Sequence, residues 1–180
     1  MGERRENNAP VWLFFGLLVR EAPLFDTVIA RLEKDFAPVA VRSAVLPFDQ
    51  SAYYEPEMGP GLLRQWVAMR DPMRIVELPD FKIHTNRLEK YWADESGARR
   101  VNIDPGYVTD AKVVLATTKD HMHRLYVDSG IYEEVTLHYK RGEGYAPWPW
   151  TYPDYQTDAA REFFTKVRAL PRANDTEQVT

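Results

Sequence analysis

Residues 11–19 read VWLFFGLLV, and this most apolar stretch of the chain decides the fold. A strand with one solvent-facing side alternates apolar and polar residues, whereas a strand buried on both faces is apolar throughout. A helix needs about 20 apolar residues to cross a bilayer, so this run is too short to span one. The stretch therefore predicts a central strand in a sheet that is covered on both faces.

A helix and a second strand follow this run. Pro23 suits the first turn of a helix, and Pro38 ends it before the strand predicted over 39–46. Between the two prolines, apolar residues recur at steps of three and four, the spacing of one helix face: Phe25, Val28, Ile29, Leu32 and Phe36. Residues 11–46 therefore predict a strand–helix–strand unit, which is consistent with a right-handed crossover.

The middle of the chain predicts another strand near 63–69 and a helix that starts at Pro79. Residues 108–118 are ambiguous, because Thr109 suits the cap of a short helix while Val113-Val114-Leu115 suits a strand. The periodicity does not choose between the two, and both stay open here.

The last third predicts a hairpin and a helix. Residues 125–127 and 131–139 read as two strands around the tight turn Asp128-Ser129-Gly130. Thr157 is the predicted cap of the final helix, whose core-facing stripe is Ala160, Phe163, Phe164, Val167 and Leu170.

These elements together predict one α+β domain over residues 10–170. We expect a mixed or largely antiparallel sheet with about three helices, and the β-α-β opening fits the start of a ferredoxin-like fold. Residues 1–9 and 171–180 are polar and lack an apolar period, so they are predicted to be a flexible leader and a flexible tail.

Composition excludes several classes of function. The net charge of −4 gives no support for binding duplex nucleic acid, which usually requires a basic face. The absence of cysteine excludes disulfides, thiolate nucleophiles and Cys-ligated zinc. The first ten residues lack the long apolar core of a signal peptide. We therefore expect a cytoplasmic protein without a membrane or duplex nucleic-acid partner.

The segment Asp104-Pro105-Gly106-Tyr107 has the residue order of a β-turn. Asp is typical of the first position and Pro of the second, and Gly tolerates a positive φ at the third. The turn by itself accounts for all four residues. A functional interpretation is that it projects Asp104 as a base or metal ligand, and Tyr107 as a hydrogen-bond donor, into a cleft.

Polar and cationic side chains then concentrate over 117–124. Lys119 and Arg124 suit an oxyanion, because Lys supplies a point charge and Arg a planar fork of donors. Thr118 adds a hydroxyl, and His123 can shuttle a proton near neutral pH. This pattern predicts a site for a small anionic, phosphorylated or nucleotide-like ligand, with His123 as acid or base and Asp104 orienting it. The pattern does not identify a cofactor, and a His-x-His pair at 121–123 does not suffice to predict a metal.

Two other polar or aromatic segments leave alternatives open. Glu134, Thr136 and His138 share one face of their strand, which lines either a polar pocket or the solvent, and we favour the solvent. The loop 147–155, PWPWTYPDY, is either pinned to the core by its rings or exposed. If it is exposed, it predicts a docking surface for a protein partner, or single-stranded RNA binding together with the Lys119–Arg124 patch.

Several motifs resemble a microbial family of domains of unknown function about 180 residues long. They are FFG at 14–16, YYEPEMGPGL at 53–62, NIDPGY at 102–107, LATTKD at 115–120, HR at 123–124 and PWTYPDY at 149–155. The resemblance implies no established activity, although some members carry the label GTP-binding protein. The chain contains neither GxxxxGK[ST] nor GxGxxG, the glycine-rich loops that cradle phosphates. The resemblance singles out Asp104, Gly106, Tyr107, Thr118, Lys119, His123 and Arg124, and from it we expect Gly106 and Tyr107 to contact the ligand.

Overall fold

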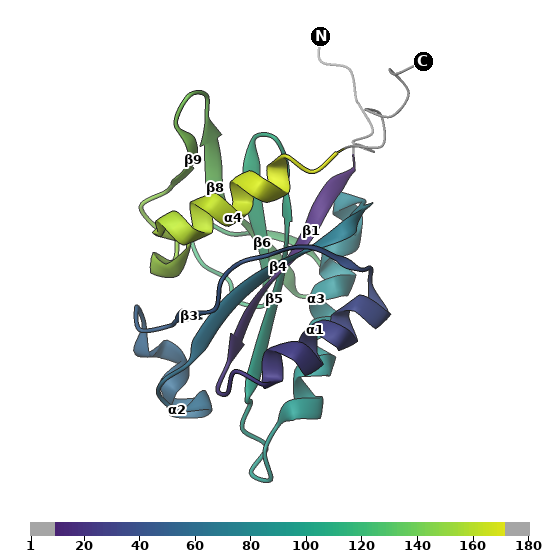
Figure 1. Cartoon of the computed structure of the whole chain (residues 1–180), viewed down its shortest axis with the longest axis vertical. Coiled ribbons are helices and arrows are strands. Elements are labelled where there is room, and N and C mark those ends of the chain that lie inside the picture. The colour runs from purple at the N-terminus through teal and green to yellow at the C-terminus, as the bar shows by residue number, and fades with distance from the viewer. Residues whose placement is uncertain (1–9, 172–180) are drawn as a thin grey trace.

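The computed structural model describes residues 10–171, and this part of the chain is an α+β domain with one nine-stranded sheet (Figure 1). The strands are β1 (Val11–Val19), β2 (Val39–Arg42), β3 (Leu46–Pro47), β4 (Leu63–Met73), β5 (Val101–Val108), β6 (Lys112–Thr117), β7 (Leu125–Asp128), β8 (Ile131–Lys140) and β9 (Gly144–Pro147). The α-helices are α1 (Leu24–Asp35), the one-turn α2 (Glu55–Met58), α3 (Leu78–Glu89) and α4 (Asp158–Arg168). Three of them are long, as predicted. The predicted leader and nearly all of the tail lie outside the described residues.

The run at 11–19 is the central strand that its composition predicts. All nine residues of β1 are buried, and the strand pairs antiparallel with β4 on one side and β5 on the other. The main strand order is β2-β4-β1-β5-β6-β8-β7, and β3 and β9 pair with β4 and β8. Each strand pairing is antiparallel, which makes the sheet of the described residues antiparallel throughout.

The first half of the domain has ferredoxin-like topology. Its strands follow the chain as β1-α1-β2-β4-α3-β5, with the short β3 between β2 and β4, and they lie in the order β5-β1-β4-β2. Each helix therefore connects two strands that have one other strand between them, which is the split β-α-β connection. The strands β6 to β9 extend this unit on the β5 side.

Both faces of the sheet are covered, because alternate residues of β1 enter two different clusters of buried side chains. Leu13 and Phe15 pack with residues of α1 and α3, whereas Trp12 and Phe14 pack with residues of α4 and the segment before it. The rings of Phe14 and Phe164 meet edge to face, with their centroids 4.9 Å apart. Figure 1 shows α4 crossing the β8–β9 side of the sheet, away from α1.

The predictions for the last third are confirmed. The strands β7 and β8 form the hairpin, and Ser129 and Gly130 have φ values of 50° and 78°, the left-handed pair that a two-residue turn requires. The side chain of Thr157 accepts a hydrogen bond from the backbone N–H of Ala160 and caps α4. Most of the ambiguous segment 108–118 is the strand β6, and none of it is helical. Thr109 caps the turn before β6 by accepting hydrogen bonds from the N–H groups of Ala111 and Lys112.

The β-turn predicted at Asp104-Pro105-Gly106-Tyr107 is wrong, because all four residues lie within β5 and pair with β1. Pro105 has no N–H to donate to a ladder, but it is tolerated because it lies one residue before the pairing with β6 begins, at Gly106. Gly106 is not among the glycines with positive φ. It is required by close packing instead, because a Cβ atom there would lie 2.3 Å from the carbonyl oxygen of Val114 and 2.6 Å from the ring of Phe14.

Among residues 10–171, no helix is both long enough and apolar enough to cross a membrane.

Candidate functional site

A pocket of about 760 Å³ lies where β5 and β6 separate. The two strands pair only over Gly106–Val108 and 113–115. Beyond that point the end of β6 pairs with β8 alone, and the loop 118–124 follows it. The segments 48–54 and 150–155 complete the walls. Ligand pockets for small organic molecules usually measure about 300–1,000 Å³, so this one has the size for such a ligand.

Basic side chains outnumber acidic ones in the pocket lining. The basic residues are Arg64, Lys82, Arg99, Lys119 and Arg124, and the acidic residues are Asp104, Glu134 and Asp154. Five cations against three anions leave two positive charges in excess, before His121 and His123 are considered. The lining is thus more basic than the acidic chain as a whole, although Arg99 also pairs with Glu57 and Glu89 outside the lining.

Arg64 on β4 is deeply buried, with 5% of its side chain exposed. Its Nη2 atom lies 2.7 Å from Oδ2 of Asp154, while Nε and Nη1 are buried without a hydrogen-bond partner among the described residues. Burial disfavours the charged form, but Asp154, Tyr155 and Asp104 together outweigh it, and the pKa of Arg64 is raised above its ordinary value. Arg64 is therefore a buried, charged guanidinium with unused donors.

The room for Arg64 comes from Gly16 in the middle of β1. A Cβ atom on Gly16 would lie 2.6 Å from the hydroxyl of Tyr155 and 3.1 Å from Nη1 of Arg64. Sequence reasoning missed Arg64, and the available signal was a charged residue inside the largely apolar run LRQWVAM at 63–69.

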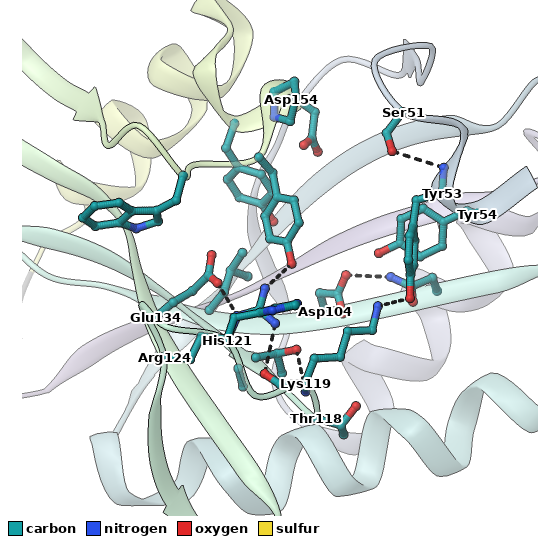
Figure 2. Close-up of a pocket in the computed structure, with 18 of the residues that line it drawn as sticks. Ser51, Tyr53, Tyr54, Asp104, Thr118, Lys119, His121, Arg124, Glu134 and Asp154 are labelled. Atoms are coloured by element: carbon teal, nitrogen blue, oxygen red, sulfur yellow. Dashed lines mark hydrogen bonds and ion pairs between the residues drawn. The ribbon is translucent and has the colours of Figure 1, made fainter.

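Arg124, which the sequence predicted to bind the ligand, lines the pocket with each of its guanidinium nitrogens already engaged. Nε donates to Oε2 of Glu134 at 2.7 Å, Nη1 to the carbonyl of Lys119 at 3.0 Å, and Nη2 to the hydroxyl of Tyr152 at 2.5 Å (Figure 2). Arg124 thus ties the loop 119–124 to β8 and to the 150–155 segment.

The side chain of Glu134 faces the pocket. The solvent-facing orientation predicted for Glu134, Thr136 and His138 is wrong for Glu134 and Thr136. Glu134 is 3% exposed and Thr136 is fully buried. The 148–155 segment packs against β8 at this point. The side-chain hydroxyl of Thr151 donates a hydrogen bond to the carbonyl of Thr136 at 2.6 Å. Alternation along the strand showed that the side chains share a face but not which face is covered.

His123 also lines the pocket, and its Nε2 atom lies 3.2 Å from Oε2 of Glu134. The ring stacks between His121 and Trp150, with centroid distances of 6.0 and 5.7 Å. The carboxylate that contacts His123 is therefore Glu134, whereas the sequence had assigned that role to Asp104.

Asp104 lines another part of the same pocket and has its own partners. Nζ of Lys82 lies 2.9 Å from Oδ1 of Asp104, and the side-chain amide of Asn102 donates to Oδ2 at 2.6 Å. Burial alone would raise the pKa of Asp104, but Lys82, then Arg64 and Asn102, lower it below its ordinary value. Lys82 reaches Asp104 from α3, a contact that sequence reasoning did not foresee.

We predict that Asp104→Asn lowers stability at pH 7 and that the difference from the wild type shrinks in acid. A carboxylate whose pKa is lower in the folded state stabilises the fold above its unfolded pKa, near 4, and this stabilisation disappears as the pH falls below that value. Urea denaturation at pH 7 and pH 3 measures it. Asp71→Asn, at an exposed position of β4, is the control and should change little at either pH. An equal difference at both pH values would contradict the prediction.

Lys119 and Thr118 lie at the mouth of the pocket. Nζ of Lys119 hydrogen-bonds the hydroxyl of Tyr53 and lies 3.9 Å from the centroid of its ring. Figure 2 shows Lys119 extending toward Tyr53, so the loop 117–124 meets the segment 51–54 at this point. Tyr53 lies in the short 3-10 helix Ala52–Tyr54, directly before α2.

Gly106 and Tyr107 are not brought to the pocket, since neither is among its lining residues. Tyr107 is 3% exposed and packs in the buried cluster on the α1–α3 face of the sheet. Burial raises the pKa of its hydroxyl above the ordinary value.

The aromatic loop 147–155 forms one wall of the pocket. Trp148 and Trp150 stack with ring centroids 5.3 Å apart, and Trp148 also packs on His138 at 4.1 Å. Trp150 and Tyr152 line the pocket with 44% and 40% of their surface exposed. Trp148 therefore packs against β8, whereas Trp150 and Tyr152 form part of the pocket wall.

Metal-binding geometry is absent from the part of the chain that the structure describes: no three His, Cys, Asp or Glu residues are grouped to hold an ion.

Comparison with known proteins identifies a family without a known activity. A family model described as "Domain of unknown function (DUF4416)" matches residues 9–170 of the 180-residue chain, which confirms the resemblance of its motifs to a domain-of-unknown-function family. No curated protein and no solved structure matches the chain.

Proposed function

The chain belongs to the family of domains of unknown function DUF4416, and we propose that its pocket binds a small phosphorylated organic molecule of about nucleotide size. The buried guanidinium of Arg64, with Nε and Nη1 unpartnered, carries this proposal. A buried donor without an acceptor costs about 1–3 kcal/mol, and more if it is charged. Arg64 lines the pocket, and an oxyanion bound against its guanidinium would add an acceptor there and offset part of that cost.

Three further features support a phosphate group attached to a larger body. The lining has an excess of basic side chains, which strengthens the attraction for an anion of more than one charge. Lys119 and Thr118 supply a second cation and a hydroxyl at the mouth. The volume of about 760 Å³ exceeds what an inorganic anion needs, and aromatic side chains line the space that remains.

Arg124 has a supporting role in this proposal. Because its nitrogens are engaged by Glu134, Lys119 and Tyr152, it positions the loop that carries Lys119 and leaves direct recognition of the anion to Arg64 and Lys119.

We predict that Arg64→Met weakens binding of a phosphorylated ligand at least tenfold, because charge-assisted hydrogen bonds contribute about 1.5–3 kcal/mol. Titration calorimetry with inorganic phosphate, ribose 5-phosphate and a set of mononucleotides measures it. Arg70→Met is the matched control, since Arg70 is an exposed arginine on the same strand and outside the pocket. Its affinity should equal that of the wild type.

Lys119→Met should weaken binding less than Arg64→Met, because Lys119 is more exposed and salt screens its charge. Failure of the folded wild type to bind any of these phosphates, or equal affinity of Arg64→Met and the wild type, would refute the proposed function.

A further inference from the structure

We infer that the pocket hydrolyses a phosphate ester, with His123 as the general base. This inference rests on the proposed function, because the phosphate must be held near His123 for the reaction. Both Arg64 and His123 line the same pocket.

The partner of His123 decides which ring nitrogen is available. Oε2 of Glu134 lies 3.2 Å from Nε2 of His123 and also accepts a hydrogen bond from Nε of Arg124 at 2.7 Å. A carboxylate that accepts from an arginine has no proton to donate, so Nε2 of His123 carries the hydrogen of this contact. In the neutral imidazole, Nδ1 then has the free lone pair of a base.

The position of the ring is fixed from several sides. Its faces stack on His121 and Trp150, with interplanar angles of 9° and 22°. The side chain of Glu134, which holds Nε2, is only 1% exposed. The side chain of His123 itself is 18% exposed, and no described residue hydrogen-bonds its Nδ1 atom. A held ring with one free nitrogen at a pocket wall is the arrangement that general-base catalysis requires.

The reaction uses water and needs no oxidant or reductant. The water oxygen forms a bond to phosphorus while Nδ1 of His123 takes one water proton. The bond between phosphorus and the ester oxygen breaks, and the leaving group departs with the electron pair of that bond. The remaining water proton stays on the product phosphate, and the proton on His123 returns to solvent. Arg64 and Lys119 offset the negative charge on the phosphoryl oxygens.

The test uses 4-nitrophenyl phosphate and bis(4-nitrophenyl) phosphate, because 4-nitrophenolate leaves without a general acid and is measured by its absorbance. We expect the wild type to release 4-nitrophenolate from at least one of them. His123→Asn should lower the rate at least tenfold. His84→Asn is the matched control, since His84 also pairs with a carboxylate, Asp35 at 2.8 Å, outside the pocket.

A structural role of His123 is separated from catalysis by two measurements. Binding of ribose 5-phosphate to His123→Asn should match the wild type, and added imidazole should restore turnover to His123→Ala. Absence of turnover by a wild type that binds ribose 5-phosphate refutes the hydrolysis and leaves the proposed function standing. Equal rates for His123→Asn and the wild type refute the role of His123. A wild type that binds no phosphate refutes both proposals.

Discussion

Glu134→Ala is expected to lower the free energy of unfolding by about 3–5 kcal/mol, the usual cost of removing one partner of a buried ion pair. The side chains of Glu134 and Arg124 are only 1% and 3% exposed. The substitution leaves the Arg124 guanidinium buried with its charge uncompensated, and it removes the contact to His123. Urea denaturation, with extrapolation to water, measures the change.

Two variants test whether the buried charge is the cause. Glu162→Ala removes an exposed glutamate that pairs with Lys166 on α4, and it should change stability by less than about 0.5 kcal/mol. The double variant Arg124→Met, Glu134→Leu should recover much of the loss, because no charge is left buried alone. A loss below about 1 kcal/mol in Glu134→Ala would contradict the prediction that breaking the buried Arg124–Glu134 ion pair strongly destabilises the fold.

Gly106→Ala is expected to destabilise the protein by about 3 kcal/mol, the upper end of the usual cost of overpacking a core. The added Cβ atom would lie 2.3 Å from the carbonyl oxygen of Val114 and 2.6 Å from the ring of Phe14. The carbonyl belongs to the backbone of β6 and cannot rotate away as a side chain can. The pairing of β5 with β6 must therefore open, close to where the pocket begins.

Gly61→Ala separates this steric effect from the general cost of losing a glycine. Gly61 has a φ of 74° and no atom within 4 Å of an added Cβ, so its substitution costs only the left-handed conformation, about 1 kcal/mol. Thermal and urea unfolding of the two variants should differ clearly. Equal losses would show that the close approach of β5 and β6 relaxes easily.

The same buried network links stability to the candidate site. Glu134 contacts both Arg124, which holds the loop carrying Lys119, and His123, the proposed base. Variants at Glu134 are therefore expected to change stability and site geometry together, whereas Arg64→Met and His123→Asn test the ligand and the chemistry separately.

The sequence by itself determined the elements whose patterns are local. The apolar run at 11–19 predicted a central strand, the turn at 128–130 a hairpin, and Thr157 with its apolar stripe the last helix. In each case, burial and backbone preference determine the types of residues that are adjacent in the chain, so a short window of sequence is sufficient to predict the element. The sequence also predicted five site residues that line the pocket: Asp104, Thr118, Lys119, His123 and Arg124.

Only the tertiary structure decided the environment of those residues. Asp104-Pro105-Gly106-Tyr107 has turn chemistry, but pairing with β1 makes it a strand, because a ladder of backbone hydrogen bonds outweighs a local preference. The partner of His123 is Glu134 of β8, and Arg64 enters the site from β4 because Gly16 leaves room for it. These contacts join residues that belong to different strands and loops. They depend on strand order and on which face is covered, and neither is encoded within a short window of sequence.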